Sequence, residues 1–380
     1  MFVHDVHWYP YHLPFSRDFT TAHGAERARE GAIVEVHTTD GTVGVGEIAP
    51  LTAFGGGTLG ESLAELPALI THGRGLCLSD ALSLVTACAL ECTGKTFHAA
   101  SLCGLETALL DAFSKAGGMS VSQLLAPPSY IPRREVLVNA VIAASDIDAA
   151  WLAAHEAVGD GFDCVKLKVA TQQTVEREVE RIVAVREAIG AHRHLRIDAN
   201  GGWTFEQART IISRCAEFDI QYVEQPLPAH DLSGMRRLRE VVPVLIAADE
   251  AVSDPDSARR ILAHGAADVL VLKPQCVGGL RACQRIIHEA TKYGVRCVIT
   301  TAVESGVGVA ATLHLAAATP DITLECGIAT LDLLADDLIT PTLKISNGRM
   351  IVPEGPGLGV TLDRDALARF SPDSGSSTEP

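Results

Sequence analysis

The middle third of the chain contains five short apolar runs, each with a charged residue at or near its carboxyl end: Cys164-Val-Lys-Leu-Lys168, His194-Leu-Arg-Ile-Asp198-Ala-Asn200, Ile220-Gln-Tyr-Val-Glu224, Val244-Leu-Ile-Ala-Ala-Asp249 and Asp268-Val-Leu-Val-Leu-Lys273. These runs are too short and too uninterrupted for amphipathic helices, so they predict strands that are buried on both faces. Their charges follow one another at intervals of 30, 26, 25 and 24 residues from Lys168 to Lys273. Each interval accommodates one helix and two loops, so the period predicts βα units.

Successive βα units of this kind predict a (β/α)8-type barrel, in which the carboxyl ends of the strands converge on one face. The carboxylates Asp198, Glu224 and Asp249 would then lie on adjacent strands, with a lysine-bearing strand on each side. Each charge taken alone could cap a helix or pair with a neighbour, but five charges placed alike favour a functional site. Clustered carboxylates repel one another, and oxygen-only ligands favour Mg²⁺ over zinc, with Mn²⁺ able to replace it. We therefore expect a magnesium site.

Composition narrows the possible partners and the compartment. The chain has 380 residues and a net charge of −16, which argues against nucleic acid or an anionic membrane as a partner. A small anionic carboxylate substrate would need local positive charge from the metal and the lysines. The ten cysteines include no Cys-x-x-Cys pair, and the N-terminus does not read as a signal peptide, so we expect a cytoplasmic protein with reduced cysteines. The oligomeric state stays open, a homo-oligomer included.

We expect four parts along the chain. They are an α+β domain over 1–130, a barrel over 131–343, a return onto the first domain over 344–370, and a disordered tail over 371–380. Two segments of the first domain, 15–31 and 49–58, read as loops that could cover a substrate or serve as plain connectors. An Asp40-Gly41 turn predicts a hairpin within 32–47, and helical spacing predicts a helix over 99–115. The first, seventh and eighth barrel strands are expected at 135–142, 295–301 and 322–327.

Five motifs at these strand ends resemble the signature of the enolase superfamily, specifically its muconate-lactonising subgroup. They are Lys166-Leu-Lys168, Asp198-Ala-Asn200, Glu224-Gln-Pro226, Asp249-Glu250 and Lys273-Pro274. The resemblance covers nearly the whole chain. It implies an incomplete (β/α)7β barrel with an α+β N-terminal capping domain that the C-terminal segment completes. It also implies Mg²⁺ held by Asp198, Glu224 and Asp249, and Lys168 and Lys273 as acid/base residues.

The chemistry of that subgroup explains the residue types. Abstraction of a proton alpha to a carboxylate creates negative charge that needs strong stabilisation near neutral pH, and a bound metal supplies it. The base must be a neutral amine. Lys166 lies two residues from Lys168 on the same strand face, and its positive charge favours the neutral form of that neighbour. We therefore interpret Lys168 as the base and Lys166 as a tuning and carboxylate-contacting residue, the alternative for Lys166 being a surface salt bridge.

Within the subgroup, Thr300-Thr301-Ala-Val-Glu304-Ser305-Gly306-Val-Gly308 is similar to the corresponding segment of o-succinylbenzoate synthases of menaquinone synthesis. The resemblance implies a hydro-lyase that carries out Mg-dependent syn dehydration of 2-succinyl-6-hydroxy-2,4-cyclohexadiene-1-carboxylate to o-succinylbenzoate. The substrate contacts expected from it are Lys166, Asn200, Thr300, Thr301, Glu304 and Ser305. Thr300-Thr301 departs from the Ser-Ser that is frequent in that family. Glu325-Cys326-Gly327 lacks the Asp-x-Asp of dipeptide epimerases, which argues against that activity.

Several other functions stay open. An N-acylamino acid racemase, a cycloisomerase or a dipeptide epimerase would use the same lysines and metal for a different outcome. A catalytically silent binding protein on the same scaffold would not need the complete set of lysines and carboxylates. A metal-free barrel that forms a Schiff base would use the lysines but would leave the three carboxylates unexplained.

Overall fold

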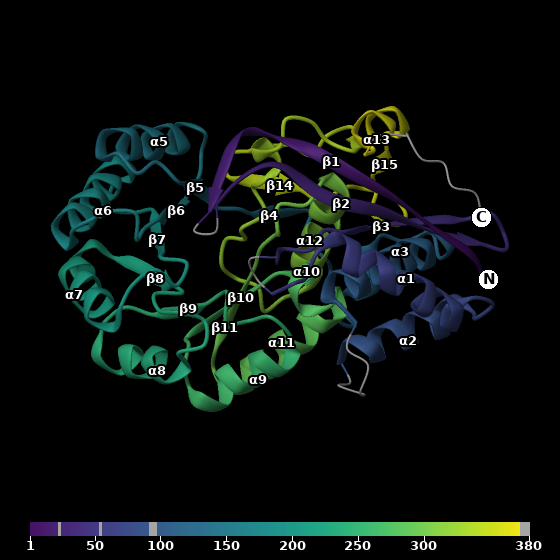
Figure 1. The fold of residues 1–380 in the computed structure, drawn as a ribbon, viewed down its shortest axis with the longest axis horizontal. Helices are drawn as coiled ribbons and strands as arrows, with labels where there is room; N and C mark the ends of the chain where they lie inside the picture. Colours follow the sequence, from purple (N-terminus) through teal and green to yellow (C-terminus); the bar gives the residue numbers. More distant parts are fainter. Residues whose placement is uncertain (22–23, 53–54, 91–96, 373–380) are drawn as a thin grey trace.

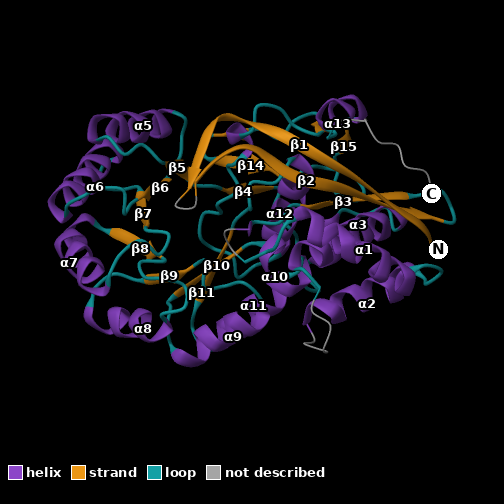
Figure 2. Ribbon diagram, viewed as in Figure 1, coloured by secondary structure: helices purple, strands orange, loops and turns teal. Residues whose placement is uncertain are grey.

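A computed structural model describes residues 1–21, 24–52, 55–90 and 97–372. Its centre is a curled parallel sheet in the order β11-β10-β9-β8-β7-β6-β5, with helices along its outer side (Figures 1 and 2). The strands are β5 (Ala140–Ile142), β6 (Cys164–Lys168), β7 (His194–Asp198), β8 (Ile220–Glu224), β9 (Ile246–Ala248), β10 (Val269–Leu272) and β11 (Arg296–Ile299). All five apolar runs are therefore strands, as predicted, and every pairing in this sheet is parallel.

The helices that alternate with these strands have clear local signals. They are α5 (Ile147–Gly159), α6 (Val175–Ile189), α7 (Phe205–Cys215), α8 (Leu232–Val241), α9 (Pro255–His264), α10 (Pro274–Val277), α11 (Leu280–Lys292) and α12 (Gly306–Ala318). In α9, for example, Asp254 accepts a hydrogen bond from Ser257 N, Pro255 occupies the first turn, and Gly265 ends the helix in the left-handed region. These residues set where α9 begins and ends.

The barrel is not closed by a full eighth strand, so the prediction of a strand over 322–327 is wrong in extent. Two isolated bridges make the closure, one between Cys326 and Val138 and one between Gly327 and Thr300. The strand expected over 135–142 is also divided, because β4 (Glu135–Leu137) pairs with β14 (Arg349–Ile351) while β5 joins the barrel. Apolar alternation predicts extended chain at both places. It carries no information on where a strand changes partners.

The capping domain combines an antiparallel sheet with helices. Its elements are β1 (Val3–Thr21), β2 (Gly24–Thr38), β3 (Val43–Ile48), α1 (Leu59–Gly73), α2 (Leu78–Leu90), α3 (Ala99–Ala116) and α4 (Val121–Leu125). The hairpin at Asp40-Gly41 and the helix over 99–115 are confirmed. The loop expected over 15–31 is wrong, because β1 and β2 continue through it and pair as far as Thr21 and Gly24. Backbone hydrogen bonds can pair two strands whose side chains follow no apolar pattern. The extension of β1 and β2 therefore could not be recognised from the sequence.

The hairpin of β1 and β2 arches from the capping domain toward the barrel (Figure 1). Its first strand contacts the segment after the barrel closure, since Ala335 N donates to Pro14 O at 2.8 Å and Phe15 bridges Leu334. The second expected cover, 49–58, is irregular over its described residues and ends at Thr58, which caps α1. Residues 53–54 of that segment lie outside the described part.

The C-terminal segment makes contacts with both parts of the molecule. Its elements are β12 (Ile339–Thr340), β13 (Ile345–Ser346), β14 (Arg349–Ile351), β15 (Thr361–Leu362) and α13 (Arg364–Phe370). β14 pairs with β4, Leu358 N donates to Asp111 of α3 at 2.7 Å, and Arg364 pairs with Glu35 of β2. The boundaries 1–130, 131–343 and 344–370 stay predictions, and the tail expected over 371–380 lies outside the described residues from 373 onward.

The apolar core has two parts. One continuous cluster fills the space between the sheets and their helices, and a smaller one fills the barrel interior with Tyr222, Ala247, Val269, Val271 and Val298. Seven of the described cysteines are buried thiols that form no disulfide, namely Cys103, Cys164, Cys215, Cys276, Cys283, Cys297 and Cys326. Within the described ranges, no helix is both long and apolar enough to span a membrane.

Candidate active site

Three buried carboxylates meet at the carboxyl ends of β7, β8 and β9. Asp198, Glu224 and Asp249 are each at most 4% exposed, and one oxygen from each lies within 4.8 Å of the others. Asp198 and Glu224 stand directly opposite each other in the pairing of β7 with β8, so both side chains enter the barrel at the same level. We call these three residues the acid cluster.

Three lysines surround the acid cluster. Lys166 Nζ lies 2.9 Å from Glu224 Oε1, and Lys168 Nζ lies 2.6 Å from Asp198 Oδ2. Lys273, which follows β10, pairs with Asp249 on the other side of the cluster. The salt bridge of Lys166 is thus buried rather than on the surface. Because β6 and β10 flank the three acid-bearing strands in the sheet order, Lys168 and Lys273 approach the cluster from two sides.

Burial and the neighbouring charges have different effects on the pKa values of these carboxylates and lysines. Burial and the neighbouring Asp198 raise the pKa of Glu224 to about 8. Burial opposes ionisation of Asp198 as well, but Lys168 and Lys166 hold the pKa of Asp198 far below its usual range. Burial also opposes the charge of Lys166, yet Glu224 and Asp198 raise its pKa well above the ordinary lysine value. The lysines therefore neutralise part of the acid cluster, and Glu224 is the least well compensated member.

Asn200 and Glu250 complete the immediate surroundings. Asn200 Oδ1 accepts a hydrogen bond from Lys168 Nζ at 3.0 Å, and Asn200 Nδ2 donates to Glu250 Oε1 at 2.7 Å. Asn200 thereby links Lys168 to a fourth carboxylate, which is partly buried. Burial, together with Asp249, raises the pKa of Glu250 to about 7. The sequence predicts Glu250 only as part of the Asp249-Glu250 motif, although its position directly after Asp249 is a usable signal.

The acid cluster fits a divalent cation. Its donors are all carboxylate oxygens, the ligand type that Mg²⁺ and related hard cations take. Glu224 Oε2 is buried and has no hydrogen-bond partner among the described residues. A buried carboxylate oxygen without a partner is costly, and a cation at this position would satisfy it.

The residues expected after β11 form hydrogen bonds within the protein. Thr300 Oγ1 donates to Gly327 O at 2.7 Å, and Thr301 Oγ1 lies 2.8 Å from Thr330 Oγ1. Glu304 Oε2 accepts from Ala302 N at 2.5 Å. Burial and Glu47 raise the pKa of Glu304 to about 7. Their roles as substrate contacts stay predictions.

Ser305 is held by the capping domain rather than turned toward the acid cluster. Its Oγ donates to Glu47 Oε2 at 2.6 Å, and its N–H donates to Glu47 Oε1 at 2.8 Å. Gly308 N donates to the same carboxylate at 2.8 Å, so Glu47 of β3 caps α12 from another domain. Only the tertiary structure reveals this contact, because Glu47 lies 258 residues away in sequence.

The sequence predicts no role for Val141 of β5. It stands opposite Lys166 in the pairing of β5 with β6, so both side chains point to the same side of the sheet. Val141 is nevertheless 43% exposed. Ala140, Val141 and Ile142 are all apolar, so the sequence alone contains no signal that Val141 is exposed.

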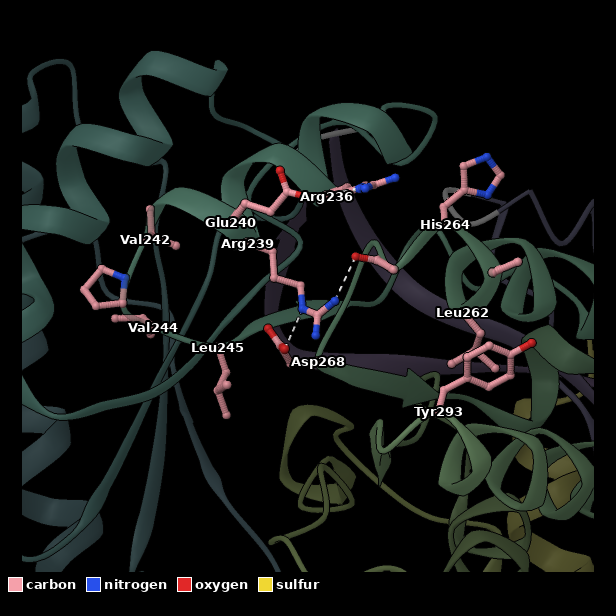
Figure 3. Close-up of a pocket in the computed structure, with 13 residues that line it drawn as sticks. Arg236, Arg239, Glu240, Val242, Val244, Leu245, Leu262, His264, Asp268 and Tyr293 are labelled. Carbon is pink, nitrogen blue, oxygen red and sulfur yellow. Dashed lines mark hydrogen bonds and ion pairs between the residues drawn. The ribbon is translucent and has the colours of Figure 1, made fainter.

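Two cavities among the described residues lie in different parts of the molecule. One of about 400 Å³ lies between the β2 segment 27–30 and the residues around Pro50 and Thr58, where the two expected covers meet. A larger one of about 750 Å³ lies near the amino ends of β9 and β10, away from the acid cluster (Figure 3). Its charged groups are paired with each other, as Arg239 is with Asp268 at 2.5 Å and Arg236 with Glu240 at 3.1 Å. This second cavity is no part of the site.

Comparison with known proteins agrees with this geometry. The family described as "Enolase C-terminal domain-like" matches residues 150–366, and the family described as "MenC, N-terminal domain" matches residues 3–74. The chain is 30% identical to muconate cycloisomerase 1-1 of Acinetobacter lwoffii over 344 residues, which are 90% of this chain and 89% of that protein. It is 39% identical to the o-succinylbenzoate synthase of Thermobifida fusca over 217 residues, which are 57% of this chain and 66% of that protein.

A solved structure matches over nearly the whole chain. The dipeptide epimerase of Enterococcus faecalis V583, complexed with Mg and the dipeptide L-Leu-L-Tyr, has a TM-score of 0.86 and 27% identity, with 95% of this chain and 100% of that chain covered. The protein therefore belongs to the enolase superfamily, whose enzymes bind a divalent metal and small carboxylate substrates. Within the superfamily, it belongs to the muconate-lactonising subgroup.

Proposed function

We propose that this enzyme is an o-succinylbenzoate synthase, a hydro-lyase that dehydrates 2-succinyl-6-hydroxy-2,4-cyclohexadiene-1-carboxylate in menaquinone biosynthesis in the cytoplasm. The observation that carries the proton chemistry is the acid cluster with Lys168 paired to Asp198 on one side and Lys273 paired to Asp249 on the other. The choice of this reaction within the subgroup is supported by the MenC N-terminal match and by the synthase of Thermobifida fusca.

Each residue has a defined task in this proposal. Asp198, Glu224 and Asp249 would hold Mg²⁺, or Mn²⁺ in its place, and the metal when bound supplies positive charge against the substrate carboxylate. Lys168 Nζ in its neutral form removes the proton alpha to that carboxylate. The same ammonium then protonates the hydroxyl that leaves from the same face, so that water departs and the ring becomes aromatic. Lys273 stays protonated on the other side, and its charge stabilises the negative charge that develops on the substrate.

The remaining expected contacts have supporting roles. Lys166 is buried beside Glu224 and provides a second positive charge for the carboxylate. Asn200 orients Lys168 through its 3.0 Å hydrogen bond. Thr300 and Thr301 border the site, and we include them as substrate contacts together with Glu304. We no longer include Ser305, because both its N–H and its hydroxyl are directed to Glu47.

An N-acylamino acid racemase is the second candidate, favoured by the second buried lysine. Racemisation needs one lysine on each face of the substrate, and Lys168 and Lys273 meet that requirement. A dipeptide epimerase is disfavoured because Glu325, at the barrel closure, is paired with Arg196 and His194 at 2.7 Å each and is not free to bind a substrate ammonium.

Assay of the purified enzyme with both substrates tests the proposal. We expect dehydration of the cyclohexadiene carboxylate to be the faster reaction. Exchange of the alpha proton of an N-acylamino acid in D₂O reports on the second candidate, since racemisation needs both lysines, while Lys273→Arg should retain exchange from one face. Efficient racemisation without dehydration would contradict the synthase proposal while leaving the roles of the lysines intact.

A further inference from the structure

Arg29 of β2 joins three segments that are far apart in the sequence. The side chain is 4% exposed. Its Nε donates to Val303 O at 3.2 Å, and its Nη1 donates to Pro50 O at 2.8 Å and to Glu30 O at 3.0 Å. Its Nη2 donates to Ala49 O. All of these acceptors are backbone carbonyls, so Arg29 fixes the course of the chain at several places at once.

One of these acceptors belongs to a strained residue. Val303 has a φ of +61°, in the left-handed region that a β-branched side chain rarely adopts. Such a conformation is strained and persists only when its surroundings hold it. Val303 lies in the loop that joins β11 to α12, two residues after Thr301. Strain of this kind beside a site calls for an identifiable restraint.

The neighbours of Val303 are restrained by other groups. Ala302 N donates to Glu304 Oε2 at 2.5 Å, and Ser305 N donates to Glu47 Oε1 at 2.8 Å. Neither bond involves the carbonyl of Val303. Among the hydrogen bonds described, the one that fixes that carbonyl comes from Arg29, which belongs to the capping domain. The restraint on the loop therefore crosses the domain interface.

We propose that Arg29 is a positioning residue that holds Val303 in its left-handed conformation and thereby sets the shape of the loop 301–305 beside Thr300 and Thr301. Through this contact, and through its bonds to Ala49 and Pro50, the capping domain determines how the barrel recognises a small carboxylate substrate. The inference rests on the proposed function only for the choice of substrate in the kinetic measurement.

A double-mutant cycle tests this coupling. Arg29→Met removes the donors while keeping a long side chain, and it should lower kcat/KM for the cyclohexadiene carboxylate by about 10- to 100-fold, mainly through KM, because the loop is misplaced. Val303→Gly adopts a positive φ without strain. We expect this variant alone to stay within about threefold of the parent, and the loss caused by Arg29→Met to shrink at least about tenfold in its background. An equal loss in both backgrounds would overturn the proposal.

Arg186 provides a matched control. Its side chain is also buried and also donates only to backbone carbonyls among its described hydrogen bonds, namely those of Phe218, Gly190, Arg193 and Asp219. Most of these carbonyls lie just before the amino ends of β7 and β8, whereas the acid cluster lies at the carboxyl ends, so Arg186→Met should destabilise the protein without changing KM. A comparable rise in KM in Arg186→Met would show that Arg29 acts only through stability. If Arg29→Met does not fold, Arg29→Lys, which keeps one donor, should give a smaller rise in KM that Val303→Gly again suppresses.

Hydrogen exchange separates this inference from the proposed function. In Arg29→Met, the amides of residues 301–306 should exchange about tenfold faster than in the parent, because the loop opens more often. Arg186→Met should leave them unchanged. If the parent enzyme does not dehydrate the cyclohexadiene carboxylate, the proposed function fails, while faster exchange would still support the role of Arg29. Unchanged exchange in Arg29→Met would overturn that role whatever the substrate.

Discussion

Strand β7 carries two buried charged residues, Arg196 and Asp198, which belong to two different groups of charged side chains in the barrel interior. Asp198 belongs to the acid cluster, whereas Arg196 pairs with Glu325 at 2.7 Å, and we call these two residues the Arg196 pair. Arg196 also donates to Gln221 and Asn139 and stacks over Tyr222, with its guanidinium carbon 4.8 Å from the ring centre. The second oxygen of Glu325 bonds His194. Both side chains of the pair are thus fully used within the protein.

The acid cluster differs from the Arg196 pair in what it leaves unsatisfied. Glu224 Oε2 has no partner among the described residues, and a fourth carboxylate, Glu250, lies nearby with its own unpartnered oxygen. Both groups are equally buried, so burial of charge does not distinguish them. An internally satisfied charge pair maintains structure, whereas a buried cluster with open oxygens is suited to a ligand. The following predictions test this distinction, from the largest expected effect to the smallest.

Metal removal should affect the acid cluster most strongly. Chelation is expected to abolish turnover, and Mg²⁺ should restore it, because the clustered carboxylates need a cation. Asp249→Asn should weaken metal binding while the protein stays folded. Binding is measured as the Mg²⁺-dependent rise in melting temperature, with the exposed Asp148→Asn on α5 as a control that keeps this rise. Full activity in excess chelator, with borohydride trapping a substrate adduct on Lys168 or Lys273, would support a Schiff-base mechanism instead.

Removal of the base should affect rate without affecting the fold. Lys168→Ala is expected to lose about 10²- to 10⁴-fold in the rate of dehydration, the usual effect of a missing general base. Lys273→Arg should be milder, because it keeps the charge although the position shifts. The exposed Lys344→Ala is the control and should retain the parent rate. Dehydration by Lys168→Ala at near the parent rate would show that the base has been assigned to the wrong residue.

Substitution in the Arg196 pair should lower the stability of the fold, in contrast to substitution of Lys168, which should lower the rate. Arg196→Met leaves Glu325 buried without its main partner and should destabilise the protein by about 3–5 kcal/mol, as measured by urea unfolding. The exposed pair of Arg177 and Glu180 offers a control, since Arg177→Met should cost less than about 1 kcal/mol. If Arg196→Met were as stable as the parent but inactive, the Arg196 pair would belong to the functional site.

The smallest expected effect is a difference in pH dependence of the metal-free protein. Burial and Asp198 raise the pKa of Glu224 to about 8, so its stabilising contribution is complete below the unfolded value of about 4.3 and is lost as the pH rises toward 8. Burial acts against ionisation of Glu325, but Arg196 lowers its pKa overall. Its contribution is therefore present above the unfolded value and is lost as the pH falls below it.

Melting temperatures in chelator between about pH 2 and pH 8 measure this difference. Glu224→Gln should flatten the decline toward pH 8 by at least about 2 °C, because a neutral amide carries no charge penalty. Glu325→Gln should instead flatten the decline on the acidic side. The same pH profile in both variants would mean that the two groups of charge are not electrostatically distinct.

Much of the site could be predicted from the sequence because its signals are local. Short apolar runs with charged ends, repeated at the length of a βα unit, predicted the strands of Lys168, Asp198 and Glu224 and the convergence of their side chains on one face. Alternation along a strand also predicted that Lys166 and Lys168 share a face. The apolar runs, their charged ends and the alternation of side chains each depend on residues that are close together in the sequence. They can therefore be recognised in a single sequence.

Only the tertiary structure decided which distant segments meet. The division of the strand at 135–142, the closure of the barrel by Cys326 and Gly327, and the continuation of the β1–β2 hairpin through 15–31 all depend on pairing between remote backbones. The capture of Ser305 by Glu47 and the restraint of Val303 by Arg29 arise in the same way, across 258 and 274 residues. Hydrogen bonds between remote groups leave no periodic pattern in either segment, because each partner satisfies the other only after the chain has folded.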